Sequence, residues 1–338
     1  MNRSELLLDT LDSFGVSAQI DKIETGPTIT TYTLRPARGV RVKDIAALKD
    51  DISVALDTDV RITKNVIEVP NKQRTIIKLT DMLGSQSKQA SPLTVALGAD
   101  QHGNALFIDI AKLPHLLVAG QTGSGKSSCL HSIIVSLLLN SMRHNVELAL
   151  IDTKRVEFAR YRNIDNVVVA GTVGGALERL RDAVRVMRNR YARLEQYGVS
   201  TITEYNEKYG AAWGKMKHAV IIIDEFADLM MSTSQEVEAL VCKIAQLGRA
   251  CGIHLIIATQ RPSVKVITGQ IKANIPARIA FKTASGIDSR VIIDRNGAET
   301  LLGAGDGLLV ADGETKRFQG AYISADDMQR CIDRLKIA

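Results

Sequence analysis

The sequence is short of the residues from which disulfide frameworks and zinc sites are built. Its 338 residues include four cysteines, and Cys129, Cys242, Cys251 and Cys331 form no C-x-x-C pair. Its six histidines form no H-E-x-x-H pattern. These absences argue against a disulfide scaffold and against a zinc site. Scattered free thiols are typical of a reducing compartment.

Long apolar runs are also missing. No stretch reaches the roughly 18–20 apolar residues of a membrane-spanning helix, and the start, Met-Asn-Arg-Ser-Glu, is not that of a signal peptide. We therefore expect a soluble, cytoplasmic protein with no membrane segment. Its 43 Lys and Arg against 37 Asp and Glu give a net charge of +6. This mild excess permits a polyanionic partner without requiring one.

One glycine-rich stretch is the most informative part of the chain. Residues Gly120 to Ser127 read G-x-x-x-x-G-K-S. The apolar run before them, residues 115–119, predicts a short buried strand, and the apolar spacing after them predicts a helix. A phosphate-binding loop requires this order of strand, loop and helix. The alternative is a chance match in a glycine-rich turn, which this context disfavours.

The residue types in this loop suit a nucleotide. Glycines let the backbone turn its N–H groups toward an anion, and the start of the helix adds its positive dipole end. Lys126 can reach the β- and γ-phosphates, and the Ser127 hydroxyl can hold Mg²⁺. We predict that ATP is bound by Gly120, Gln121, Thr122, Gly123, Ser124, Gly125, Lys126, Ser127 and Ser128.

The sequence pattern changes along the chain. Residues 1–82 mix helical and strand-like segments, which predicts a small α+β module, and the polar segment 83–92 is the expected linker. From residue 93 to 338 strands alternate with helices, which predicts an α/β fold with a mostly parallel sheet. The module's expected strands are 18–23, 28–34, 59–69 and 74–79; those of the second region are 116–119, 147–151, 167–170, 220–223, 254–258, 277–281 and 307–310.

Two carboxylates follow the buried strand at 219–223. Such an apolar strand belongs in the middle of a parallel sheet, so its carboxyl end should open beside the phosphate loop. We predict that Asp224 holds the Mg²⁺ shell, directly or through water, and that Glu225 deprotonates the attacking water. The alternative is that the pair only caps the following helix.

The next strand carries two further candidates. Gln260 follows its carboxyl end and is expected near the γ-phosphate, where it would help to position water; alternatively it is a turn-starting amide. Arg249 precedes the same strand and should therefore lie at the opposite edge of the sheet, too far to serve its own nucleotide. It could act as an arginine finger for a neighbouring subunit, which predicts a head-to-tail ring. The alternative is a surface arginine without a role.

Longer stretches around these residues resemble a known family. They are residues 224–231, 252–263, 266–281, 287–290 and 297–303. Together they resemble the motor region of the FtsK/SpoIIIE family of double-stranded DNA translocases, and the resemblance covers nearly the whole chain. Three positions depart from the family pattern: Thr153 stands where proline is usual, Gly286 where lysine is usual, and Lys265 where an acidic residue is frequent.

The resemblance implies a RecA-like P-loop ATPase domain, preceded by a smaller domain, in a homo-hexameric ring around duplex DNA. It supports Arg249 as the finger in trans. It also implies that Arg261, Lys272 and Arg290 hold DNA phosphates without reading sequence. The alternative for each is a surface charge or, for Arg290, a second nucleotide contact.

Two questions stay open after the resemblance. Some relatives serve conjugative DNA transfer or protein secretion, so a different cargo is the alternative function. The sequence begins just before the small module and ends just after the ATPase core, which fits either a shortened motor or a minimal relative.

Overall fold

The chain forms two compact units. The computed structural model describes residues 2–85, 91–140 and 146–337. Unit 1 comprises Met1–Ile77 and Ala99–Ala105, and unit 2 comprises Lys78–Gly98 and Leu106–Ala338. The expected linker overlaps helix α4 (Leu79–Ser85) of unit 2, and residues 86–90 of that linker lie outside the described residues.

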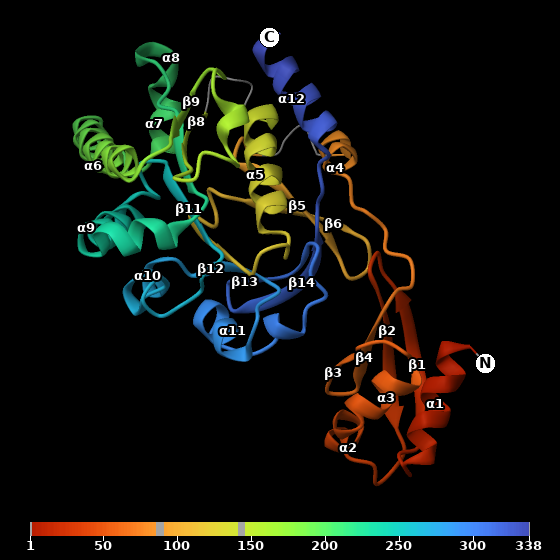
Figure 1. Ribbon diagram of the computed structural model, residues 1–338. Helices are drawn as coiled ribbons and strands as arrows, with labels where there is room; N and C mark the ends of the chain where they lie inside the picture. The colour runs from red at the N-terminus through yellow and green to blue at the C-terminus, as the bar shows by residue number, and fades with distance from the viewer. Residues whose placement is uncertain (1, 86–90, 141–145, 338) are drawn as a thin grey trace. The chain divides into compact units, whose positions relative to one another are not determined.

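Unit 1 is an antiparallel sheet packed against three helices (Figure 1). Its apolar cluster joins Leu7 and Leu11 of the first helix to Tyr32 and Ile67 of the sheet. Asn2 and Glu5 form a capping box that starts this helix. The strands pair in the order β1 (Ala18–Thr25), β2 (Ile29–Pro36), β4 (Val66–Pro70), β3 (Arg61–Thr63), and the helices are α1 (Arg3–Ser13), α2 (Val42–Ala47) and α3 (Lys49–Ala55). The expected small α+β module is confirmed.

Two strand predictions in unit 1 were wrong. Residues 59–69 are a hairpin rather than one strand, because Lys64 takes a positive φ of 56° and reverses the chain between β3 and β4. Residues 74–79 form no strand: the Thr75 N–H donates to the Pro27 carbonyl, and Leu79 already begins α4.

Unit 2 is built on a ten-stranded sheet, and the predicted mostly parallel α/β fold is confirmed. The consecutive neighbours β12, β7, β11, β10, β8 and β9 run parallel out to the edge strand β9, whereas β13 and β14 add antiparallel pairs. All seven strands expected in this region are present, and β5, β6 and β14 are additional. The strands are β5 (Thr94–Asp100), β6 (Ala105–Asp109), β7 (His115–Ala119), β8 (Val146–Ile151), β9 (Val167–Ala170), β10 (His218–Ile223), β11 (Ile253–Thr259), β12 (Ala277–Phe281), β13 (Asp306–Ala311) and β14 (Glu314–Gly320).

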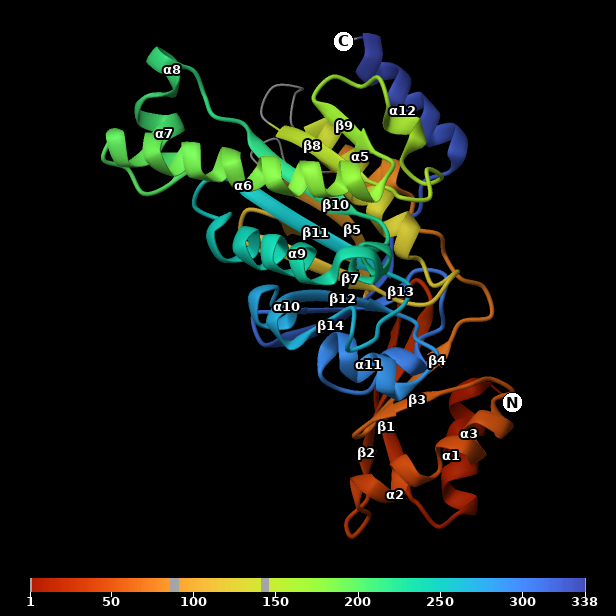
Figure 2. The ribbon, with the colours of Figure 1, turned by 60° about the vertical axis from the view of Figure 1, so that its left-hand side comes forward.

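Helices cover both faces of this sheet (Figures 1 and 2). On one face, Leu180 of α6 and Val241 of α9 share an apolar cluster with Ile221 and Leu255 of the sheet. On the other, the Ser132 hydroxyl of α5 donates to the Ala96 carbonyl of β5. The helices of this unit after α4 are α5 (Lys126–Asn140), α6 (Val173–Gln196), α7 (Ile202–Lys208), α8 (Gly210–Trp213), α9 (Phe226–Leu247), α10 (Gly269–Asn274), α11 (Gly286–Ile293) and α12 (Ala325–Ile337), with short 3₁₀ turns at Ala159–Tyr161 and Ala298–Thr300.

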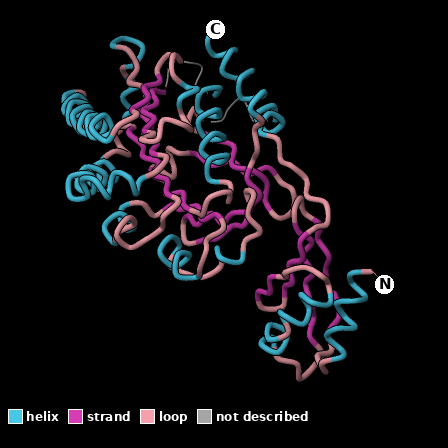
Figure 3. The backbone as a smooth tube through the Cα atoms, viewed as in Figure 1, coloured by secondary structure: helices cyan, strands magenta, loops and turns pink. Residues whose placement is uncertain are grey.

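The parallel core decides where the loops meet. Because β7, β10 and β11 run in one direction, the segments after them emerge at the same edge of the sheet, which we call the carboxyl edge. The segments before them emerge at the opposite, amino edge. Figure 3 shows in pink the loops that join the strands to the helices.

Within the described ranges, the helices lack the combination of length and apolar character that a bilayer-spanning segment needs.

Candidate active site at the carboxyl edge

The phosphate loop joins β7 to α5 through backbone that only glycine takes easily. Gly123 and Gly125 have φ angles of +75° and +115°. A Cβ atom on Gly125 would lie 2.6 Å from the Cα of Gly305, whose N–H donates to the Ser124 carbonyl at 2.8 Å. Gly305 therefore packs directly against the loop, whose N–H groups lie at the start of a helix, where an anion is favoured.

Lys126 turns back from the loop to the end of β10. Its ammonium group donates to the Asp224 carbonyl at 2.8 Å and to the Asp224 carboxylate at 2.5 Å, and both side chains are only 3% exposed. Burial raises the pKa of Asp224, and the Lys126 charge opposes that shift. The pair joins two predicted site residues that are 98 positions apart in the sequence.

Glu225 is buried and held by three hydrogen bonds. One carboxylate oxygen accepts from the Thr259 hydroxyl at 2.6 Å and from the Ala227 N–H at 3.3 Å, and the other accepts from the Gln260 N–H at 3.1 Å. Glu225 is also the N-cap of α9, so the capping role weighed as an alternative is present too. Thr259 did not figure among the predicted site residues, although its place at the end of a strand beside Gln260 was a usable signal.

Gln260 lies against the phosphate loop. Its side-chain oxygen accepts from the Thr122 hydroxyl at 2.7 Å. The structure therefore brings Gln260, Glu225 and the loop to one edge of the sheet, which is the arrangement expected from the strand order.

The donors around Lys126 suit a hard cation such as Mg²⁺. The described residues contain no group of three or more His, Cys, Asp or Glu ready to enclose a metal, but Mg²⁺ usually takes only one or two protein oxygens beside phosphate and water. The charges of Asp152 and Glu157 both raise the pKa of Asp224, so several carboxylates surround one ammonium group. One buried oxygen of Asp152 also has no hydrogen-bond partner. This excess of negative charge fits a cation held by Ser127 and Asp224.

Glu157 is a part of this edge that the sequence analysis missed. It accepts from the Ser127 hydroxyl at 3.1 Å, and its other oxygen lies 3.3 Å from His131 Nε2. The hydrogen bond from His131 lowers the pKa of Glu157 to about 2, although partial burial opposes the shift. Glu157 follows β8 after a turn of irregular chain, where no motif marks it.

Arg249 lies at the amino edge, away from the loop. It is exposed between the end of α9 and the start of β11. Burial, together with the nearby Arg249 charge, lowers the pKa of His115 to about 4. Since His115 starts β7 and the phosphate loop follows the end of β7, Arg249 lies at the other end of the strands from the nucleotide site of its own chain.

The three predicted DNA contacts come from separate elements. Arg261 is exposed just after β11, and Arg290 of α11 is exposed and donates to the Asn296 side chain at 2.6 Å. Lys272 of α10 forms an ion pair with Asp294 at 2.6 Å. Their role on DNA stays a prediction.

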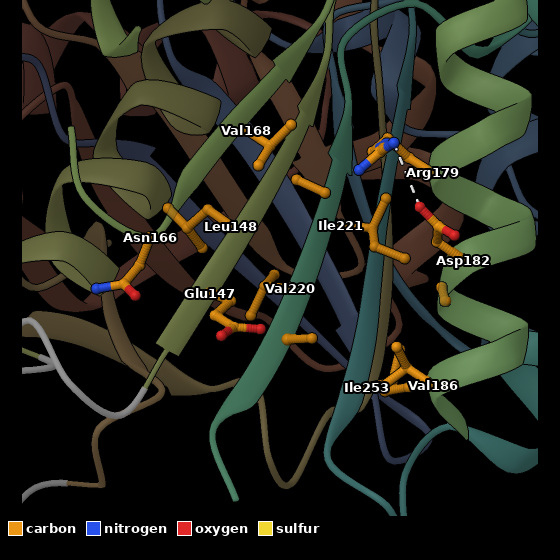
Figure 4. A pocket seen from close by; sticks show the side chains of 13 residues that line it. Glu147, Leu148, Asn166, Val168, Arg179, Asp182, Val186, Val220, Ile221 and Ile253 are labelled. Carbon is orange, nitrogen blue, oxygen red and sulfur yellow. Dashed lines mark ion pairs between the residues drawn. The ribbon is translucent and has the colours of Figure 1, made fainter. Parts of the chain in front are cut away.

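A separate pocket lies between α6 and the sheet. It encloses about 370 Å³ and is lined by apolar side chains such as Leu148 and Ile221, with the ion pair of Arg179 and Asp182 at its rim (Figure 4). No residue of the phosphate loop lines it. It is therefore distinct from the nucleotide site.

Family models match both units of the chain. Residues 78–264 match the FtsK/SpoIIIE family, and residues 1–71 match the FtsK alpha domain. The chain is 44% identical over 348 residues to the DNA translocase FtsK of Clostridium acetobutylicum, covering 98% of this chain and 46% of that protein. It is 42% identical over 355 residues to the DNA translocase FtsK of Lactiplantibacillus plantarum, and this match covers 99% of this chain and 45% of that protein. The chain thus spans about half the length of the curated relatives it matches.

Solved structures show the same fold. One is the pCW3 conjugation coupling protein TcpA, in a structure with ATPγS. It matches with a TM-score of 0.71 at 24% identity, and the match covers 98% of this chain and 99% of the TcpA chain. The Type VII secretion ATPase EccC of Thermomonospora curvata has a TM-score of 0.68 at 26% identity and covers 77% of this chain and 34% of that chain. Both the alpha domain and the ATPase core are matched by family models, and the chain belongs to the FtsK/SpoIIIE family.

Proposed function

We propose that this chain is the ATP-hydrolysing motor of a double-stranded DNA translocase. The observation that carries the proposal is the group at the carboxyl edge: the Lys126–Asp224 pair beside the phosphate loop, with Glu225 held by Thr259 and Gln260. Membership of a family whose curated members are named DNA translocases supports duplex DNA as the track.

The chain's own groups account for binding of the triphosphate. The loop N–H groups and the start of α5 attract the phosphates. Lys126, which forms an ion pair with Asp224, gains phosphate oxygens as partners when ATP enters. Asp224 and Ser127 would then hold Mg²⁺, which supplies positive charge to the β- and γ-phosphate oxygens.

Glu225 is the proposed base for hydrolysis. It accepts one proton from a water molecule as the water oxygen bonds to the γ-phosphorus, and the bond to the bridging oxygen breaks with its electron pair left on ADP. The hydrogen bonds from Thr259 and Gln260 hold the Glu225 carboxylate while Gln260 stays beside Thr122 of the loop. Gln260 can therefore report the state of the γ-phosphate to the base.

Assembly follows from the placement of Arg249. An arginine at the amino edge cannot complete the site of its own chain, but a neighbour docked head to tail can receive it. We propose a homo-hexameric ring in the cytoplasm with Arg249 as the finger in trans. Arg261, Lys272 and Arg290 would hold phosphates of the enclosed duplex, which gives a grip that does not depend on base sequence.

The test is ATP hydrolysis with and without duplex DNA. We expect duplex DNA to raise the rate several-fold and Lys126→Ala to lower it at least about 100-fold, because the buried Asp224 loses its counter-charge and the phosphates lose theirs. Lys316→Ala, which removes a lysine on β14 that is 60% exposed, is the matched control and should hydrolyse like the wild type. A rate that ignores duplex DNA would contradict the translocase and favour a different cargo, such as a secreted protein.

A further inference from the structure

We propose that Glu157 is a positioning residue for the Ser127 hydroxyl, and that His131 and Tyr161 hold Glu157 in place. The proposal rests on the function proposed above and adds a role to three residues that the motifs leave unassigned. It starts from one contact: the Ser127 hydroxyl donates to a Glu157 carboxylate oxygen at 3.1 Å.

The direction of this hydrogen bond matters for a metal ligand. A serine hydroxyl has one proton and two lone pairs. If the oxygen is to offer a lone pair to a cation, its proton must point to an acceptor elsewhere. Glu157 is such an acceptor, so the hydroxyl is oriented before any cation arrives. Groups that orient metal ligands in this way commonly change metal affinity by about 10- to 100-fold.

Glu157 is itself fixed from the same helix that carries Ser127. Ser127 and His131 are four residues apart on α5 and therefore share one face of the helix. Each meets a different oxygen of Glu157, at 3.1 Å and 3.3 Å. Two side chains of α5, one turn apart, therefore contact the Glu157 carboxylate.

The chain around Glu157 is anchored as well. The Phe158 N–H donates to the Asp152 carboxylate at 3.0 Å, and the hydroxyl of the fully buried Tyr161 lies 2.8 Å from His131 Nδ1. With its proton on Nε2, the imidazole donates to Glu157 and accepts from Tyr161. The Glu157 side chain remains one-third exposed, so these contacts do not bury it in the core.

The experiment measures nucleotide binding rather than hydrolysis. Binding of a fluorescent ADP to the full chain is titrated at increasing Mg²⁺ concentration and again with a chelator, for wild type, Ser127→Ala, Glu157→Ala, Glu157→Gln and the double variant Ser127→Ala/Glu157→Ala. Glu147→Ala, which removes a half-exposed carboxylate at the amino end of β8, is the matched control. Thermal unfolding checks that each variant is folded.

We expect Glu157→Ala to raise the half-saturating Mg²⁺ concentration about 10-fold; the titration with chelator measures separately any change in metal-free binding. Glu157→Gln keeps an acceptor oxygen, so it should recover most of that loss. In the double variant Glu157→Ala should add little to Ser127→Ala, because it acts through the hydroxyl that is already gone.

Three results would overturn the inference. They are an unchanged Mg²⁺ requirement in Glu157→Ala, a Glu157→Gln variant as impaired as Glu157→Ala, and effects of the two single variants that multiply in the double variant, as expected for a direct metal ligand. If the wild type binds no nucleotide with or without Mg²⁺, the proposed function itself fails, which is a different outcome from any of these.

Discussion

The buried polar side chains at the two edges of the parallel sheet differ in their charge. At the carboxyl edge, Lys126 and Asp224 are buried as a charged pair. At the amino edge, burial lowers the pKa of His115 and His218 to about 4 and that of His254 to about 3, so these imidazoles are neutral at neutral pH.

The histidines form a row across three neighbouring strands. His254 Nε2 lies 3.4 Å from His218 Nδ1, and His115 Nδ1 accepts from the Leu255 N–H at 3.2 Å. Beside this neutral row stands the exposed Arg249. The comparison teaches a division of roles: the carboxyl edge holds buried charges that a nucleotide and its cation can rearrange, whereas the amino edge buries three neutral imidazoles and leaves Arg249 exposed beside them.

The largest expected effect concerns that outward charge. Arg249→Ala should lower DNA-stimulated hydrolysis about 1,000-fold or more, as for other arginine fingers, while nucleotide binding stays near the wild-type value. The reason is that Arg249 lies at the far end of the strands from its own phosphate loop. Hydrolysis rates and binding of fluorescent ADP separate the two effects.

A mixing experiment tests whether Arg249 acts in trans. Rings made from Arg249→Ala and Lys126→Ala subunits contain some sites that pair an intact Lys126 with an intact Arg249 from the neighbour, so part of the activity should return. The matched control for Arg249→Ala is Arg185→Ala, which removes another exposed arginine, one of α6 that pairs with Asp182. If mixing restores nothing, the amino edge does not complete a neighbouring site.

A smaller effect is expected inside the carboxyl edge. Thr259→Val removes the 2.6 Å hydrogen bond to Glu225 and leaves a buried carboxylate with one donor fewer. A hydrogen bond to a charged group is worth about 1.5–3 kcal/mol, so we expect kcat to fall about 10- to 100-fold with little change in KM. Steady-state kinetics measure both constants.

The variant Thr259→Ser tests whether the lost hydrogen bond causes the fall in kcat of Thr259→Val. Thr259→Ser keeps the hydroxyl and should retain most of the wild-type kcat. Glu225→Gln sets the scale for loss of the base itself, about 100-fold or more. If Thr259→Ser is as slow as Thr259→Val, packing of the methyl group rather than the hydrogen bond is responsible.

Local patterns made most of the carboxyl edge predictable from sequence. The glycine positions and Lys126 are fixed by the backbone of one loop, and Asp224 and Glu225 end a strand whose unbroken apolar run indicates a buried parallel position. Glu157 was not predictable in this way. It reaches Ser127 from 30 residues further along the chain, after irregular structure that has no periodicity.

The strands that were missed also have physical reasons. β5 contains Gly98, where an added Cβ would lie 1.9 Å from the Gln319 carbonyl oxygen, so close packing between backbones replaces the usual β-branched pattern. β14 is polar and lacks alternation, and its buried Arg317 pairs with Asp306 of β13 at 2.7 Å. A buried ion pair across two strands leaves no apolar signal in the sequence.

The smallest expected effect is that of the three neutral histidines on the free energy of unfolding, which appears only below neutral pH. Their pKa values are about 3–4 in the folded chain and about 6.5 in an unfolded one. Between these values the unfolded chain binds more protons, so the free energy of unfolding falls as pH drops from about 6.5 toward 4, and it is unaffected by these groups above that range. Urea unfolding followed by circular dichroism at a series of pH values measures the slope.

A single substitution sharpens this test of the two edges. Arg190 and Arg249 both help to keep the imidazoles uncharged. His218→Gln removes one of the three titrating groups, so the slope between pH 6.5 and 4.5 should decrease by up to about 1.4 kcal/mol per pH unit. The carboxyl edge is the same in both proteins, so Glu157, whose pKa is about 2, and Asp224, whose pKa is raised by burial, contribute equally to the two slopes. An unchanged slope in His218→Gln would mean that folding does not lower the pKa of His218, and the contrast between a charged edge and an edge that holds its imidazoles neutral would then be wrong.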